Sequence, residues 1–318
     1  MFFESFKTTG LAVIQIMLLA GIGYTLAKKG ILNDIGLGAL SRLVVEVALP
    51  VLIFCQLTKD FSFSKYPHWW LFPLMSIFIT FAGLFVGSLF VRFIKDAECK
   101  KQFLSLIAFQ NSGYLPMALI AALLPADKLA PMFIYLFLFL MGFNLVIWSF
   151  GVYMLSFKTK SRFELTSLFS PPVVATLFSL LFVFLGLNKV VPDFLLKPLR
   201  MIGETTIPLA MLVVGGNLAQ IHLKKIDKKA VALIVLAKLI IMPGLGLCLI
   251  SRFNLSGLIG LFVLMQLAVP PATSLSVIMR HYKKEDLLIS QGIFFGHMIS
   301  IISLPIFLSL YFSWVMIK

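Results

Sequence analysis

Stretches of apolar residues recur along the whole chain, and short polar loops separate them. A helix that crosses a bilayer needs roughly 20 predominantly apolar residues, and ten stretches approach or exceed that length. The pattern therefore predicts an all-α integral membrane protein with ten transmembrane helices. The predicted helices cover residues 9–27, 36–58, 69–91, 103–124, 130–156, 171–187, 199–221, 230–250, 257–279 and 287–312.

Polar and proline residues interrupt two of these stretches at corresponding positions. The fourth contains Gln110-Asn111-Ser112-Gly113-Tyr114-Leu115-Pro116, and the ninth contains Gln266-Leu267-Ala268-Val269-Pro270-Pro271-Ala272-Thr273. Proline leaves a backbone carbonyl without its helical hydrogen bond. In hydrocarbon, such a carbonyl is tolerated only where it is buried in protein or lines a water-filled cavity. Such paired breaks point to the substrate site of a transporter. The substrate-binding candidates are therefore Asn111, Ser112, Tyr114, Pro116, Gln266, Pro270, Pro271, Ala272 and Thr273, with Asn144 in the middle of the fifth stretch.

The breaks also predict the charge of the ligand. The second half of each broken helix, expected after Pro116 and after Pro271, begins with unpaired amides that carry partial positive charge. Such ends bind carboxylates or phosphates without an arginine, and the two ends would converge if the segments cross. Since the spans hold few acids and one lysine, the site favours a small organic anion over a cation.

The composition supports the membrane assignment and changes the meaning of the charge. Hydrophobic residues make up 60% of the chain and charged residues 13%, against about 25% charged residues in soluble domains. The net charge of +14 would suggest a nucleic-acid partner for a soluble protein. Here the basic residues lie in short loops or near the ends of spans, 17 of them on the side of the loops after odd-numbered spans and 9 on the other side. The positive-inside rule therefore predicts a multi-pass protein of the cell inner membrane, with both termini extracytoplasmic and no nucleic-acid partner.

The two halves of the chain echo each other. Glu46 precedes Pro50 by four residues and Glu204 precedes Pro208 by four, at an offset of 158, while Pro116 and Pro271 are separated by 155. Each half holds five predicted spans, and an odd number forces the second copy to insert upside down. We expect inverted five-helix repeats over residues 1–156 and 171–318, joined by a short cytoplasmic linker over 157–170.

Three residues inside predicted spans, two glutamates and a lysine, are candidates for coupling transport to an ion gradient. These are Glu46, Glu204 and Lys238, because an intramembrane ionisable group indicates function by default. The alternative for each glutamate is a hydrogen bond to backbone freed by the nearby proline, or a position near water. Lys238 would pair with a glutamate or meet an anionic substrate. Asn217 and His297 are interpreted as packed polar residues.

Enzymatic motifs are missing from the sequence. It contains no H-E-x-x-H, G-x-S-x-G or P-loop pattern, so we expect no catalytic residue. The four histidines lack the spacing of metal ligands, and we expect neither a metal nor a cofactor.

Taken together, several segments resemble the auxin efflux carrier family, which includes plant PIN carriers and bacterial malate and malonate permeases. The resemblance implies a scaffold of spans 1, 2, 6 and 7, often a homodimer contact, and a transport domain of spans 3–5 and 8–10 with crossed helices four and nine. It also implies that Asn111 and Asn144 contact a substrate carboxylate. The matching segments are 48–50, 110–116, 143–148, 207–211, 269–272, 281–286 and 300–305.

The sequence thus predicts a secondary active transporter of small organic anions, carboxylates such as malate, malonate or auxin-like acids, driven by protons. A sodium-coupled organic-anion symporter of the bile-acid type is an alternative. It would need a cluster of side-chain oxygens at the crossing, where neither break carries an acid. A non-transporting membrane receptor is a further alternative of another class.

The loop charges generate a topology prediction. A reporter that is active only outside the cytoplasm should be active when fused after Lys318, and inactive when inserted in the linker over 157–170. Fusions with a reporter that is active only in the cytoplasm should show the reverse. Cytoplasmic activity at Lys318 would overturn the assigned orientation.

Overall fold

The computed structural model describes residues 2–156, 168–221, 223, 226–255, 257–282 and 285–314, and within these ranges the regular structure is helical. The helices are α1 (Phe2–Lys28), α2 (Asp34–Leu43), η1 (Val44–Ala48), α3 (Leu49–Asp60), α4 (Leu71–Val91), α5 (Ala97–Ala108), α6 (Tyr114–Leu123), α7 (Ala126–Val146), η2 (Ile147–Gly151), α8 (Val152–Ser156), α9 (Pro171–Phe184), η4 (Leu187–Lys189), α10 (Asp193–Glu204), α11 (Thr206–Ala219), α12 (Lys228–Val235), η5 (Leu236–Ile241), α13 (Met242–Arg252), α14 (Gly257–Ala268), α15 (Ser274–His281) and α16 (Leu287–Trp314).

The prediction of an all-α membrane protein is confirmed. Seven helical segments of the described residues are long and apolar enough to cross a bilayer. The other three predicted spans contain shorter apolar helices: α6 and α14 belong to the broken segments, and α9 has 14 residues. The seven long segments are Phe2–Lys28, Asp34–Asp60, Leu71–Val91, Ala126–Ser156, Asp193–Ala219, Lys228–Arg252 and Leu287–Trp314.

The largest boundary error in a broken segment is the start of the fourth predicted span. Helix α5 begins at Ala97 rather than near 103, because Asp96 caps it by accepting a hydrogen bond from the Cys99 amide at 2.8 Å. That hydrogen bond also lowers the pKa of the Asp96 carboxyl below its ordinary value. The charged first turn of α5 lies outside the hydrophobic pattern and was therefore missed.

Three of the long segments contain a wide turn of π-helix, and two of these turns precede a proline. The turn η1 comes before Pro50 and η5 before Pro243. Since proline cannot donate a backbone hydrogen bond, a wider turn accommodates the carbonyl that would have received it. Glu46 lies in η1 and Lys238 in η5, while Glu204 ends α10 just before α11 begins. The three coupling candidates therefore lie at helix irregularities.

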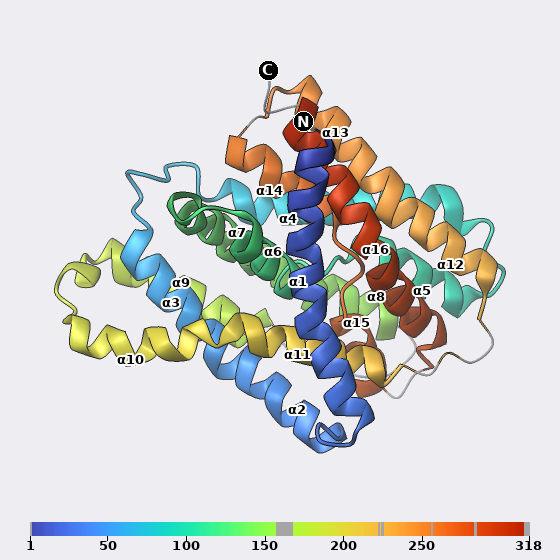
Figure 1. The fold of residues 1–318 in the computed structure, drawn as a ribbon, viewed down its shortest axis with the longest axis horizontal. Coiled ribbons are helices and arrows are strands. Elements are labelled where there is room, and N and C mark those ends of the chain that lie inside the picture. Colours follow the sequence, from blue (N-terminus) through green and yellow to red (C-terminus); the bar gives the residue numbers. More distant parts are fainter. Residues whose placement is uncertain are drawn as a thin grey trace.

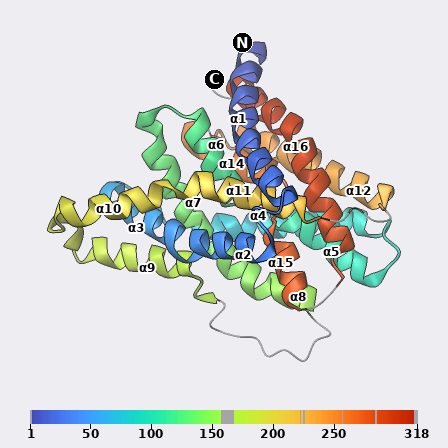
Figure 2. The ribbon, with the colours of Figure 1, turned by 60° about the horizontal axis from the view of Figure 1, so that its bottom comes forward.

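The helices form an elongated bundle (Figures 1 and 2). Helices α3, α9 and α10 pack together at one end, and α5 and α12 lie toward the other end. Helix α1 crosses α11 and packs against α16. The start of α1 and the end of α16 lie at the same end of the molecule, where the hydroxyl oxygens of Thr9 and Ser309 are 2.9 Å apart.

The hydrogen bonds between connections divide the connections into two groups. A chain that crosses a membrane back and forth requires such a division. Segments after odd-numbered spans bond to one another, and so do segments after even-numbered spans. The first group holds bonds from Gln220 to Asp34, Gln102 to Glu285, and Asp227 to Gln291. The second holds bonds from Asn188 to Thr58 and from Tyr311 to Gly257.

Glycines allow α1 and α11 to touch through their backbones. A Cβ atom added at Gly23 would overlap the backbone of Leu212, and one added at Gly215 would overlap the carbonyl of Ala20. In a membrane, where lipid removes the hydrophobic drive for helix association, such small residues permit the close van der Waals contact that holds helices together.

A matched pair of substitutions in α1 tests this contact. Gly23→Ala should lower the thermal stability of the purified protein, since overpacking of this kind costs about 1–3 kcal/mol. Gly21→Ala, two residues away with open space around the new methyl group, should leave stability unchanged or raise it, because alanine favours helix. Equal melting temperatures for the two variants would contradict the contact.

Candidate functional site

The two interrupted segments meet and pair with each other. The Asn111 amide donates to the Pro270 carbonyl at 2.8 Å, and the Ala272 amide donates to the Phe109 carbonyl at 2.9 Å. These bonds form an antiparallel bridge between Gln110 and Pro271. The sequence expectation that the breaks converge is therefore confirmed in the geometry. Each break satisfies the other's backbone groups, which buried peptides require.

Both second half-helices begin at this bridge. Helix α15 starts at Ser274, after Pro271 as expected. Helix α6 starts at Tyr114, so the expectation that it begins after Pro116 is wrong. Pro116 lies in the first turn of α6, where a helix needs no backbone donor. The positive ends of the two half-helices, α6 and α15, consequently face one region of the protein.

A cavity of about 430 Å³ opens beside the bridge. Asn111 and Asn144 contribute amide groups to its wall, and Phe143 and Trp148 contribute aromatic rings. Among the described residues, no acidic or basic side chain lines it. The remaining wall is formed by Val45, Leu49, Gln110, Ser112, Gly113, Tyr114, Leu140, Ile147, Phe169, Ser170, Pro171, Pro172, Ala272, Thr273 and Ser274.

The structure thus gathers most of the predicted binding residues in one wall. Asn111, Ser112, Tyr114, Asn144, Ala272 and Thr273 line the cavity. Pro116, Gln266, Pro270 and Pro271 do not line it, although the last three support the bridge. The segment 169–172 was not anticipated as part of the site, and its proline pair at the start of a span was the available signal.

Side chains from two helices, α14 and α16, contact the bridge segment. The Gln266 amide donates to the Ser112 carbonyl at 3.3 Å. His297 of α16 lies with Nε2 3.3 Å from Nδ2 of Asn111. Both His297 and Gln266 are fully buried. His297 therefore contacts a predicted substrate residue, which the sequence interpretation as a packed polar residue missed, since 186 positions separate the two.

Gln110 differs from its neighbours. It is fully buried and lines the cavity, yet neither atom of its amide has a hydrogen-bond partner in the described part of the chain. An unmade buried hydrogen bond costs about 1–3 kcal/mol. A cavity wall that carries this cost is typical of sites where stability is sacrificed for binding.

The coupling candidates lie elsewhere. Glu46 is exposed and forms an ion pair with Arg42, with 3.0 Å between Oε1 and Nε. Glu204 is also exposed, at the end of α10. Lys238 is fully buried in η5, and within the described residues its Nζ has no hydrogen-bond partner. Of the two roles considered for Lys238, a hydrogen-bonded pair with a glutamate is therefore not found within the described residues.

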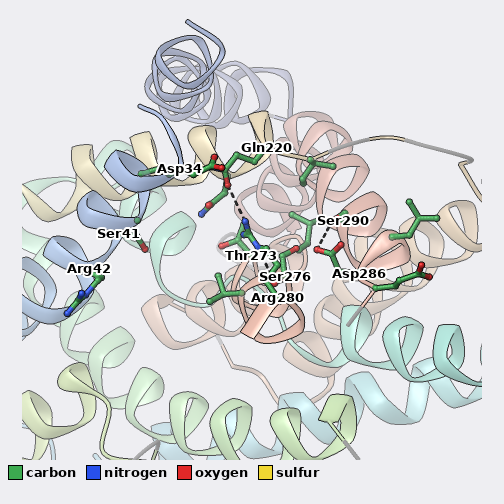
Figure 3. A pocket seen from close by; sticks show the side chains of 17 residues that line it. Asp34, Ser41, Arg42, Gln220, Thr273, Ser276, Arg280, Asp286 and Ser290 are labelled. Atoms are coloured by element: carbon green, nitrogen blue, oxygen red, sulfur yellow. Dashed lines mark hydrogen bonds between the residues drawn. The ribbon is translucent and has the colours of Figure 1, made fainter. Parts of the chain in front are cut away.

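A second and larger cavity, of about 940 Å³, lies between α2 and α11 on one side and α15 and α16 on the other (Figure 3). Gln220 spans its wall: it donates to Asp34 at 2.8 Å and accepts from Arg280 at 3.2 Å. Thr273 lines both cavities. The larger cavity thus reaches Thr273, two residues after Pro271 of the bridge, and Asn217 lies in its wall.

Metal-ligating side chains are not clustered in the described ranges. No three residues among their histidines, cysteines, aspartates and glutamates lie close enough to hold a metal ion. The chemistry available at the bridge is therefore hydrogen bonding by amides, hydroxyls and half-helix ends, next to aromatic surface.

Comparison with known proteins identifies relatives along nearly the whole chain. The model of a family described as membrane transport protein matches residues 10–166 and 155–308. The chain is 22% identical to Protein PIN-LIKES 1 of Arabidopsis thaliana, over 98% of this chain and 80% of that protein. It is 26% identical to an uncharacterized transporter of Methanocaldococcus jannaschii, over 89% of this chain and 92% of the relative. An uncharacterized transporter of Methanothermobacter thermautotrophicus is 25% identical over 92% and 95% of the two chains.

Two glutamines at the bridge give a stability test. Gln110→Met should leave the melting temperature unchanged or raise it, because it replaces an unsatisfied buried amide by apolar atoms. Gln266→Met removes the donor to Ser112 and should destabilise the protein by about 1–3 kcal/mol. Thermal unfolding of the two purified variants without added ligand measures the difference. Equal losses would show that the Gln110 amide is satisfied.

Proposed function

Because the chain belongs to the membrane transport protein family, the auxin efflux carrier-like family that its motifs resemble, we propose that it is a secondary active transporter of small organic anions. Its relatives carry the names of PIN-LIKES proteins and of transporters, which supports a carrier rather than an enzyme. The observation that carries the anion specificity is the cavity beside the backbone bridge.

This cavity offers partial positive charge without a full charge. The start of α6, at Gly113 and Tyr114, and the start of α15, at Thr273 and Ser274, both border it. Amides at the start of a helix attract carboxylates. Asn111 and Asn144 would add side-chain hydrogen bonds to the same group, as expected from the family resemblance.

The rest of the cavity suits the carbon skeleton of such an anion. Phe143, Trp148 and Ile147 provide apolar surface in the same cavity wall. A volume of about 430 Å³ falls within the roughly 300–1,000 Å³ of small-molecule sites. A carboxylate with a small aliphatic or aromatic body, such as malate, malonate or an auxin-like acid, therefore matches the cavity.

The proposed mechanism is alternating access around the bridge. We assign the chain to ten membrane-spanning segments in two inverted repeats, which the matched irregularities at Glu46 and at Glu204 support. Spans 3–5 and 8–10 would rock or slide against a scaffold of spans 1, 2, 6 and 7, through which two copies would form a homodimer. The larger cavity, whose described wall carries both acidic and basic side chains, would be the cytoplasmic approach in an inward-open state.

Proton coupling fits the cavity better than sodium coupling. A sodium site needs several oxygen ligands and favours a carboxylate, and no acid of the described residues lines the cavity. A proton can instead enter on a protein group or with the substrate. Uptake by proteoliposomes separates a carrier of either kind from a receptor, which would bind the anion without moving it.

Substitution of Asn111 tests the proposal. Asn111→Ala should raise the apparent KM for malate, malonate or indole-3-acetate roughly ten- to hundredfold in proteoliposomes, since a hydrogen bond to a charged group contributes about 1.5–3 kcal/mol. Asn188→Ala, which removes an amide far from both cavities, should leave uptake unchanged. Normal uptake kinetics in Asn111→Ala would refute the site, and a wild type that accumulates none of these anions would refute the function.

A further inference from the structure

The contact between His297 and Asn111 defines the protonation state of the imidazole. His297 Nδ1 lies 2.8 Å from the carbonyl oxygen of Ile293, one helical turn earlier in α16. A carbonyl oxygen can only accept, so Nδ1 must carry a hydrogen. In a neutral imidazole the other nitrogen is then a bare acceptor. Nε2 therefore accepts from the Asn111 amide group 3.3 Å away.

This arrangement also fixes the orientation of the Asn111 amide. Its NH2 group points to His297, so its oxygen is the amide atom left for the cavity that Asn111 lines. A carboxylate accepts hydrogen bonds and is repelled by another acceptor. With neutral His297, Asn111 consequently presents an unfavourable atom to an anionic ligand.

Protonation of His297 would reverse this orientation. Both nitrogens of imidazolium are donors, so Nε2 could no longer accept from the NH2 group of Asn111. The bond survives only if the amide turns over, with its oxygen accepting from Nε2. The NH2 group then faces the cavity with two donors, and a bound carboxylate would gain hydrogen bonds as well as a nearby positive charge.

We propose that His297 couples proton binding to anion binding by setting which end of the Asn111 amide faces the cavity. His297 acts here as a positioning residue, through Asn111. The inference rests on the proposed function and assigns its proton to a residue. Because the two binding events favour each other, linkage makes the anion raise proton affinity as much as the proton raises anion affinity.

The charged surroundings of His297 strengthen this linkage. Besides His297, helix α16 itself carries one ionisable residue, Tyr311 in its last turn, and α14 carries none. Among the elements that pack against α16, η5 carries Lys238, which is fully buried at the middle of this element. The other ionisable residues of elements packed on α16 lie within two turns of a helix end: Glu4, Lys7, Tyr24, Lys28, Glu98, Cys99, Lys100, Lys101, Lys228, Lys229, Cys248, Arg252, Arg280 and His281.

It follows that no carboxylate of the described residues lies at mid-depth on these elements to balance a charged His297. A positive charge on Lys238 would oppose protonation of the imidazole. The arriving anion is then the group that makes imidazolium favourable. This is the order that a symporter needs, because the proton should bind tightly only when the substrate is also present.

Proton uptake on anion binding tests the coupling. Binding of malate, malonate and indole-3-acetate to purified protein is measured by calorimetry between pH 6.5 and 8, in two buffers of different ionisation enthalpy. Wild type should take up as much as one proton per anion, and its Kd should fall by up to about tenfold per unit decrease in pH. His297→Gln should bind with little pH dependence and without this uptake. His68→Gln, in an exposed loop, should behave as wild type.

The outcomes separate the two proposals. A wild type that binds none of the three anions overturns the proposed function together with its coupling. Binding with the same proton uptake in His297→Gln as in wild type overturns the role of His297 alone. Subtraction between variants removes any titration of the ligands themselves.

A second measurement does not require the His297 variant to fold. In a protein with His68→Gln, His222→Gln and His281→Gln, His297 is the one histidine left, and its nitrogen atoms can be followed by infrared or nuclear magnetic resonance after isotope labelling. Without anion the signal should be that of the Nδ1–H tautomer, with Nε2 gaining a hydrogen when anion binds. An Nε2–H tautomer in the free protein, or no change on binding, would overturn the proposal.

Discussion

Two backbone hydrogen bonds, from Asn111 to Pro270 and from Ala272 to Phe109, are the interaction on which the centre of this protein depends. Peptide groups in hydrocarbon must find partners within the protein, and prolines near both breaks prevent a continuous helix there. Each break would be costly alone. Together they satisfy each other, and their pairing creates two half-helix starts beside one cavity.

Hydrophobic periodicity, with the breaks, was enough to predict the membrane class, the positions of the helices and the convergence of the two interrupted segments. It could not predict contacts between distant residues. The Asn111–His297 contact joins α16 to a loop 186 positions earlier, and nothing local marks it. Asp96 shows the same limit on a smaller scale, because one capping carboxylate extends α5 beyond the apolar pattern. Pro116 was misplaced as a breaker because proline in a first turn starts a helix as readily as it ends one.

The site can select an anion without burying a full charge when no ligand is bound. Its wall in the described residues carries amides, hydroxyl groups and helix ends, but no full charge. A fixed arginine would bind an anion more tightly, yet it would also have to cross the bilayer unpaired whenever the carrier returned without substrate, at a large desolvation cost. A histidine that becomes charged only with the anion avoids that penalty. Lys238, by contrast, is fully buried and its Nζ has no hydrogen-bond partner among the described residues.

The packing of Gly296 extends the bridge into α16. A Cβ atom at this position would approach Cδ of Pro271 to 2.7 Å, so the ninth and tenth predicted spans fit together only while residue 296 lacks a side chain. His297 follows directly in the chain. In a related protein without the proline pair, residue 296 could carry a side chain. The register of α16 would then change, and the imidazole of residue 297 would no longer lie beside the bridge. Substitutions at the break and on α16 should thus be inherited together across related carriers, as one evolutionary unit.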